Sequence, residues 1–120
     1  MIVITFEVTP AEGREDDYLA LAARMRPLAR DIPGFVAVER FRSIAEPRRL
    51  VSVSTFEDEA AVADWRRLPE HRTAQRAGRE GILEDYRLRV SRVLRDYGPD
   101  SRDEAPADSN AVHCPWAADA

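Results

Sequence analysis

Residues 57–81, EDEAAVADWRRLPEHRTAQRAGREG, decide how the second half of this chain folds. The stretch opens with three acidic residues, which suit a helix N-terminus, and Thr55 with Asp58 has the form of a capping box. An apolar helical face follows. Pro69 then interrupts it, and we expect this proline to end one helix and begin another, because proline is favoured at the first helical position. Two consecutive helical segments are therefore predicted.

The same stretch holds the two side chains with the most chemistry. Trp65 falls on the apolar face of the first helical segment, and His71 opens the second. His71 is the only histidine before residue 113. Because Pro69 stands between them, the sequence does not predict that Trp65 and His71 share a helical face.

The segments on either side of this stretch read as strands and one further helix. Apolar residues alternate with polar ones in the strand-like segments and recur every three or four residues in the helical one. The predicted elements are strands at residues 2–8, 35–44, 49–56 and 86–97, and a helix at 18–32. In the last strand the apolar register shifts after Val90, which predicts a bulge or a change of neighbours.

This order is β-α-β-β-α-β, the ferredoxin-like α+β arrangement: a four-stranded antiparallel sheet with its helices on one face. The strands carry apolar side chains on both faces, so the face away from the helices would be exposed in a monomer. We therefore expect a homodimer in which two sheets pair into an α+β barrel. The domain is predicted to span residues 1–97, and residues 98–120 to form an acidic, flexible tail.

Composition narrows the class of partner. The net charge of -4 is that of residues 98–120, which leaves the body balanced and without the basic surface that nucleic acid requires. The single cysteine excludes an internal disulfide framework. No apolar run is long enough to span a membrane, and the chain begins directly with a strand pattern. A cytoplasmic protein that binds neither nucleic acid nor membrane is expected.

Four segments together resemble the antibiotic biosynthesis monooxygenase family of dimeric α+β barrels. The similarity covers residues 1–97, and its most specific parts are the PGF after the first helix and the FEDE-to-EHR block. The segments are IPGFVAVERFRS (32–43), LVSVSTFEDEAAVADW (50–65), LPEHRTAQRAGR (68–79) and DYRLRVSRVLRDYG (85–98). The resemblance implies a monooxygenase that uses O2 without a cofactor or metal. Its substrate would be a small aromatic, quinol or polyketide-like molecule.

His71 and Tyr86 are the predicted catalytic residues. A neutral imidazole can take a proton from a phenol or enol near neutral pH, and the resemblance implies that such a deprotonated substrate passes an electron to oxygen. Tyr86 would orient the substrate and Trp65 would stack on it. The alternatives are a surface histidine held by a neighbour, and a tryptophan that anchors the core.

Side chains on the strands complete the predicted site. Phe6 and Phe41 are expected to line the pocket, and Arg40 and Arg89 to orient a carboxylate or an oxyanion. The alternative for the arginines is ion pairing at the dimer seam.

Other functions on the same barrel remain open. They are a non-catalytic dimer that binds a hydrophobic metabolite, and a cofactor-free isomerase or decarboxylase. Haem degradation is not expected. In the haem-degrading branch of the family an axial histidine would fall near Gln75 or Arg76, and an asparagine lies on the first strand. This chain has no histidine at the first place and no asparagine within residues 2–8. In the tail, His113, Cys114 and Trp116 form a short cluster, for which packing of Trp116 on a partner subunit is the preferred interpretation.

Overall fold

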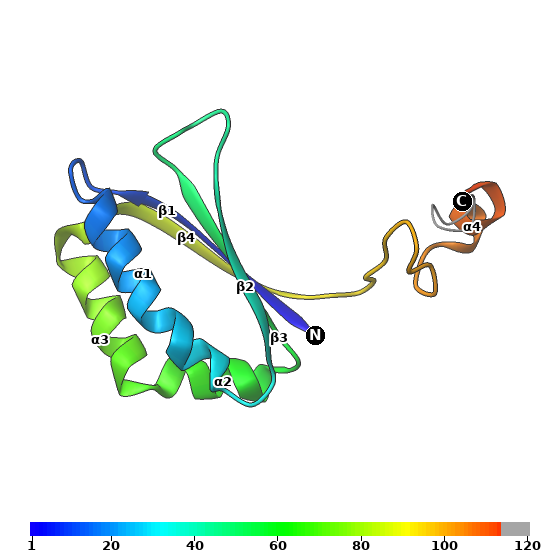
Figure 1. The fold of residues 1–120 in the computed structure, drawn as a ribbon, viewed down its shortest axis with the longest axis horizontal. Coiled ribbons are helices and arrows are strands. Elements are labelled where there is room, and N and C mark those ends of the chain that lie inside the picture. Colours follow the sequence, from blue (N-terminus) through cyan, green and yellow to red (C-terminus); the bar gives the residue numbers. More distant parts are fainter. Residues whose placement is uncertain (114–120) are drawn as a thin grey trace.

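The computed structural model describes residues 1–113 and has the predicted ferredoxin-like α+β fold (Figure 1). Its elements follow the predicted order, with α2 and α3 divided at Pro69. The elements are β1 (Ile2–Pro10), α1 (Glu15–Arg30), β2 (Phe35–Arg42), β3 (Leu50–Phe56), α2 (Glu59–Arg67), α3 (Pro69–Ala77), a single π-helical turn (Gly78–Ile82), β4 (Leu83–Arg92) and α4 (Ala107–Val112). None of these helices is long and apolar enough to cross a membrane. Cys114 and Trp116 lie outside the described residues.

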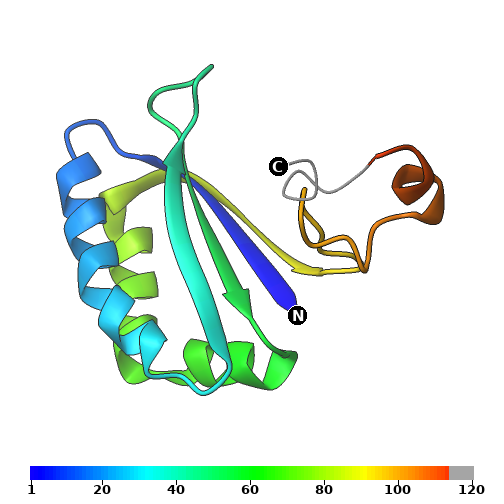
Figure 2. The same ribbon diagram turned by 45° about the vertical axis from the view of Figure 1, so that its right-hand side comes forward.

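The four strands form one antiparallel sheet in the order β2-β3-β1-β4. Figures 1 and 2 show α1, α2 and α3 together on one face of this sheet, while the other face is bare. β1 and β3 are the inner strands and β4 is an edge strand next to β1. The side of a strand that a residue occupies therefore decides whether it meets the helices.

A register shift in β2 corrects the predicted faces of that strand. Strict alternation along residues 35–44 would place Phe35 and Phe41 on the same face. The ladder instead shifts between Phe35 and Ala37, so that Phe35 pairs with Phe56 and Ala37 with Thr55. Phe35 therefore packs under the helices, edge-to-face with Phe56 at 5.8 Å between ring centroids. Phe41 lies on the bare face.

β4 begins earlier and ends earlier than predicted, at Leu83 and Arg92 rather than at residues 86 and 97. Its pairing with β1 is regular from Val8 opposite Tyr86 to Ile2 opposite Arg92, and the one irregularity is at Thr9/Pro10. The predicted bulge after Val90 is therefore wrong. The apolar register changes there because β1 begins at Ile2, so β4 has no partner strand beyond it.

The N-terminus of α2 is capped by Asp58, not by the predicted capping box at Thr55. The Asp58 side chain accepts a hydrogen bond of 2.9 Å from the backbone N–H of Ala61, while Thr55 remains in β3. We predict that Asp58→Ala lowers the free energy of unfolding by about 0.5–2 kcal/mol, because an N–H of the first turn loses its acceptor. Urea denaturation measures this loss, and Asp58→Asn should retain most of the stability. An equal loss in both variants would contradict the capping role.

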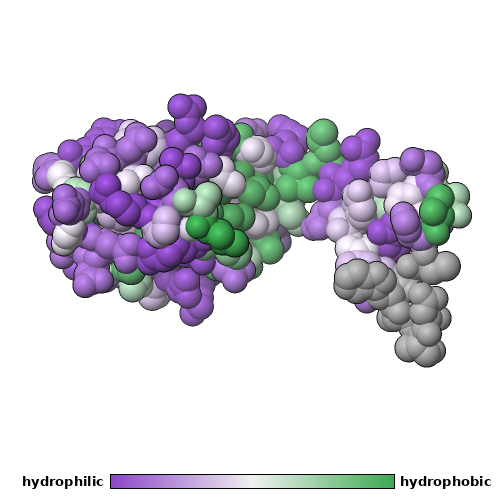
Figure 3. Space-filling model, turned by 90° about the horizontal axis from the view of Figure 1, so that it is seen from above, coloured by the Kyte–Doolittle hydropathy of each residue, from purple (hydrophilic) through white to green (hydrophobic). Residues whose placement is uncertain are grey.

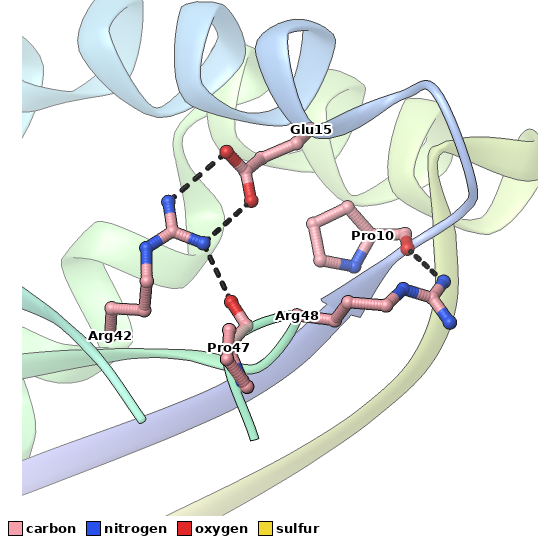
Figure 4. A network of polar contacts seen from close by, with 5 residues as sticks. All are labelled: Pro10, Glu15, Arg42, Pro47 and Arg48. Atoms are coloured by element: carbon pink, nitrogen blue, oxygen red, sulfur yellow. Dashed lines mark hydrogen bonds and ion pairs between the residues drawn. The ribbon is translucent and has the colours of Figure 1, made fainter. Parts of the chain in front are cut away.

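A polar network fastens the β2–β3 hairpin to the elements behind it (Figure 4). Arg42 donates to both carboxylate oxygens of Glu15 on α1, at 2.9 and 3.1 Å, and to the backbone oxygen of Pro47 at 2.7 Å. Arg48 donates to the backbone oxygen of Pro10 at 3.3 Å. The hydrogen bonds from Arg42 lower the pKa of Glu15. The hairpin is thereby held against the N-terminal end of α1.

The segment after β4 leaves the body and carries α4 at its far end (Figure 1). Arg102 organises it. Its guanidinium donates to Asn110, Ser109 and the backbone oxygen of Gly98, and it lies 5.3 Å from the centroid of the Tyr97 ring. A local structure thus exists within residues 97–110. The predicted flexibility of this tail and the domain boundary at residue 97 stay predictions.

Candidate functional site

The sheet separates the predicted site residues into two groups. Phe6 lies opposite Ser52, which lies opposite Arg40, and Tyr86 lies opposite Val8. Since directly paired residues share a face, Phe6, Arg40 and Tyr86 all belong to the side that the helices cover.

The two remaining strand residues belong to the bare face. Phe41 pairs with Val51 and Arg89 with Thr5. Arg89 also forms an ion pair of 3.4 Å with Glu7. The structure therefore does not bring Phe41 and Arg89 together with the other predicted site residues. Their predicted contact with a substrate would require the bare face to line a barrel.

The core under the helices is divided into two clusters. One contains Ile2, Ile4 and Phe56, with Ile32, Ala61 and Val62 from the loops and helices, and the other contains Val8, Tyr18 and Leu50. Between Leu50 and Phe56, the helix-facing positions of β3 are Ser52 and Ser54, two of the smallest side chains in the sheet. Ser54 is only half-buried in spite of its central position. The middle of the layer between sheet and helices therefore has a floor of small, polar side chains, which we call the serine floor.

One side of the serine floor is open. On β4 the helix-facing side chains of Tyr86, Leu88 and Val90 are 51%, 51% and 52% exposed, because β4 is an edge strand and no helix covers it. The ring of Tyr86 lies 5.8 Å from that of Phe6 and is tilted by 55°. Tyr86, Leu88 and Val90 form an aromatic and aliphatic surface, which we call the β4 wall. Leu88 and Val90 were absent from the predicted site, although the sequence already shows them in the alternation of the last strand.

Trp65 and His71 are in contact, which the sequence did not predict. Their ring centroids are 4.6 Å apart and the rings are tilted by 48°. At Pro69 the chain turns from α2 directly into α3, so the first turn of α3 adjoins the last turn of α2 (Figure 1). Trp65 also packs against the cluster of Ile4 and Phe56, next to Ser54. Trp65 thus packs against the core and at the same time contacts the ring of His71.

The environment of His71 favours its neutral form. Its Nδ1 is buried and has no hydrogen-bond partner. Burial is the largest effect and lowers the pKa of His71 below its ordinary value of 6.5; the backbone oxygen of Arg66 opposes this, while the charges of Arg66 and Arg72 add to it. A neutral imidazole with a free nitrogen can accept a proton, which is the chemistry predicted from the sequence.

This burial makes stability depend on pH. In the unfolded chain His71 titrates near its ordinary pKa of 6.5, whereas in the folded chain its pKa is lower. Between these two values the unfolded chain binds more protons, so the free energy of unfolding should fall as the pH drops through 6.5. Urea denaturation from about pH 8 to about pH 6 measures this. His71→Phe should flatten the curve and His113→Phe, a change at an exposed histidine, should not. Equal curves for the two variants would contradict it.

Arg40 meets a tyrosine of α1. Its guanidinium carbon is 5.5 Å from the centroid of the Tyr18 ring, and its Nε donates to the Tyr18 hydroxyl at 3.4 Å. Tyr18 itself is 6% exposed. Tyr18 was not among the predicted site residues; its place in the apolar stripe of the first helix gave it only a core role.

The bare face of the sheet presents a different environment. A mainly polar hollow lies at one end of it. Its lining consists of Glu7, Thr9, Arg49, Asp85 and Arg87, together with Val8 and the predicted site residue Tyr86. Within residues 1–113 no three His, Cys, Asp or Glu side chains are grouped so that they could hold a metal ion. The contact between His71 and Trp65 and the aromatic pair of Phe6 and Tyr86 lie on the helix-covered side.

Comparison with known proteins agrees with this architecture. A sequence model of the antibiotic biosynthesis monooxygenase family matches residues 1–77. The chain belongs to this family. A relative from Pyricularia oryzae, described as "Jasmonate monooxygenase ABM", is 39% identical over 93 residues, 78% of this chain. The chain spans only 43% of that relative's length. The uncharacterised protein YqjZ of Bacillus subtilis is 38% identical over 78 residues, which cover 65% of this chain and 67% of YqjZ.

Solved structures of other proteins share the fold of this chain. A protein of Mycobacterium tuberculosis superposes with a TM-score of 0.73 at 15% identity, covering 81% of this chain and 98% of the other. A protein of Shewanella oneidensis superposes with a TM-score of 0.69 at 23% identity, covering 75% and 87%. At these identities the similarity concerns the fold alone.

Proposed function

We propose that this protein is a cytoplasmic, cofactor-independent monooxygenase that oxidises a small, mainly apolar molecule bound between the helices and the sheet. The observation that carries the proposal is His71: it has a buried, unpaired Nδ1 and a lowered pKa, and its ring lies tilted against that of Trp65, which packs on the core cluster of Ile4 and Phe56. A structural histidine of this kind would ordinarily have both ring nitrogens satisfied. A base for an incoming substrate needs one nitrogen free.

The proposed reaction is the conversion of an activated CH2 group to a carbonyl. His71 takes a proton from the substrate, and the resulting phenolate or enolate transfers an electron to O2. One oxygen atom then enters the substrate as C=O and the other leaves as water with the two hydrogens, so that atoms and electrons balance. Trp65 would stack on the substrate, and Tyr86 would orient it from the β4 wall.

We further propose that the working unit is a homodimer. On the bare face, Val3, Val51 and Val53 share a surface with Phe41, which is 47% exposed. Figure 3 shows further apolar side chains gathered where the body meets the segment after β4, and Leu94 there is 78% exposed. Burying these surfaces is favourable, and a second copy with the same sheet is the occupant that pairs them face to face. Light scattering at micromolar concentration should give twice the chain mass; a monomer would overturn this part of the proposal.

Oxygen consumption tests the reaction directly. The purified protein is mixed with anthrones, hydroquinones and jasmonate, the last chosen for the relative's name. Uptake of one O2 for each carbonyl formed, undiminished by a metal chelator, is the expected result. A compound that binds without oxygen uptake would instead support the non-catalytic binder, and conversion without uptake would support the isomerase or decarboxylase.

A further inference from the structure

Arg40, on the helix-covered side, differs from most other arginines of the described chain. Only Arg40 and Arg102 are shielded to an intermediate degree, while all the others are exposed. Arg102 is satisfied, since it donates to three oxygen atoms in its own segment. Arg40 has one long hydrogen bond, 3.4 Å to the phenol of Tyr18. Of the five N–H donors of its guanidinium, most are available to something else.

Among residues 1–113, no carboxylate forms an ion pair with Arg40. Arg42, two residues along the same strand, has a carboxylate partner in Glu15. On the opposite face of the sheet, Arg89 pairs with Glu7. Glu39, the neighbour of Arg40 in the chain, pairs with Val53 on the bare face and so points the other way. Partial burial of an unpaired cation costs free energy, which an incoming anion would recover.

The surroundings of Arg40 define what kind of anion would fit. Tyr18 holds the guanidinium by a cation–π contact, so its orientation is set before a ligand arrives. Along one row of the sheet, Arg40 is followed by Ser52, Phe6 and Leu88. This row places a cation at one end, a small polar residue in the middle and an apolar surface at the other. A ligand about two strand spacings long, roughly 10 Å, would reach from Arg40 to Phe6 on β1, and the β4 wall lies one strand spacing further on.

We propose that Arg40 binds a carboxylate of the substrate, and that the substrate class is therefore an apolar carboxylic acid. The apolar body lies over the serine floor toward Phe6 and Leu88, and the carboxylate accepts hydrogen bonds from the guanidinium. A carboxylate is favoured because the planar fork of arginine matches its two oxygens. The inference rests on the proposed function for the position of the ligand, but it concerns binding and does not require oxygen transfer.

Calorimetric titration with two matched probes tests it. Naphthylacetate carries a carboxylate and naphthylacetamide is its uncharged counterpart of similar shape. The wild-type protein should bind the acid about ten- to a hundredfold more tightly than the amide. Arg40→Met should abolish this preference, and Arg40→Lys, which keeps the charge without the fork, should retain part of it. Arg42→Met removes an arginine two residues along the same strand and should leave the preference intact.

Each outcome decides between the alternatives. Equal affinity of the wild-type protein for both probes, or binding of neither, would overturn the carboxylate site, and this comparison requires no variant to fold. A preference that survives in Arg40→Met would overturn the assignment to Arg40. If the preference is found but no compound consumes oxygen, the carboxylate site stands and the proposed monooxygenase reaction fails.

Discussion

Replacing His71 by alanine should lower kcat/KM for oxygen consumption by about 10²–10⁴-fold, the usual contribution of a positioned general base. The reason is that His71 holds a buried nitrogen free of hydrogen bonds, in a ring fixed against Trp65. No other histidine lies within the predicted domain. The measurement is initial oxygen uptake with whichever compound the substrate panel identifies.

The chain supplies its own control, because His113→Ala removes the second histidine from an exposed position in the tail and should leave kcat/KM unchanged. The pH dependence of kcat/KM provides a second test, because the direction of the pKa shift predicts where activity is lost. Since burial lowers the pKa of His71, its basic form persists below pH 6.5, and the acidic limb of kcat/KM should have an apparent pKa below 6.5. His71→Ala should lose this limb together with the rate. Full activity in His71→Ala would remove His71 from the mechanism and leave Tyr86 as the remaining predicted catalytic residue.

The order of elements could be predicted from the sequence because it depends on local rules. Alternation along β1 and β3 and the position of Pro69 gave the strands and the division between α2 and α3. Where a boundary depended on a neighbour in space, the prediction failed. β4 ends at Arg92 because β1 begins at Ile2, although the apolar residues of the sequence continue to Tyr97.

The site was less predictable, because a strand residue belongs to it only if its side chain lies on the face of the sheet that the helices cover. Alternation distinguishes two faces without saying which is covered, so Phe6 and Phe41 were assigned to one site although they lie on opposite sides. The register shift after Phe35 added to this, since it reverses the alternation within β2. The contact of Trp65 with His71 was missed for a related reason. It spans a proline break, across which helical periodicity carries no information.

Gly34→Ala should lower the free energy of unfolding by about 2–5 kcal/mol. Gly34 has φ of +90°, a left-handed conformation that costs an L-residue about 1–2 kcal/mol. A Cβ at this position would also lie 2.9 Å from the Cβ of Ala61, which is itself buried in the core. Relieving that contact would move α2 relative to β2, and overpacking of this kind costs about 1–3 kcal/mol. Urea denaturation measures the change.

Gly13→Ala separates the two effects. Gly13 has φ of +77°, but nothing lies within 4 Å of where its Cβ would be, so alanine there should bear the conformational cost alone. The difference between the two variants, about 1–3 kcal/mol, then reports the contact with Ala61. Adding Ala61→Gly to Gly34→Ala should recover part of that difference, because the second Cβ is gone. Gly34 also accepts a hydrogen bond of 2.7 Å from the N–H of Glu57 through its backbone oxygen, so this close approach joins the start of β2 to the segment leading into α2. An equal loss of unfolding free energy in Gly34→Ala and Gly13→Ala would mean that α2 can move away from β2 at no cost. The position of Trp65 and His71 relative to the sheet would then not be fixed, and it would no longer support the proposed site.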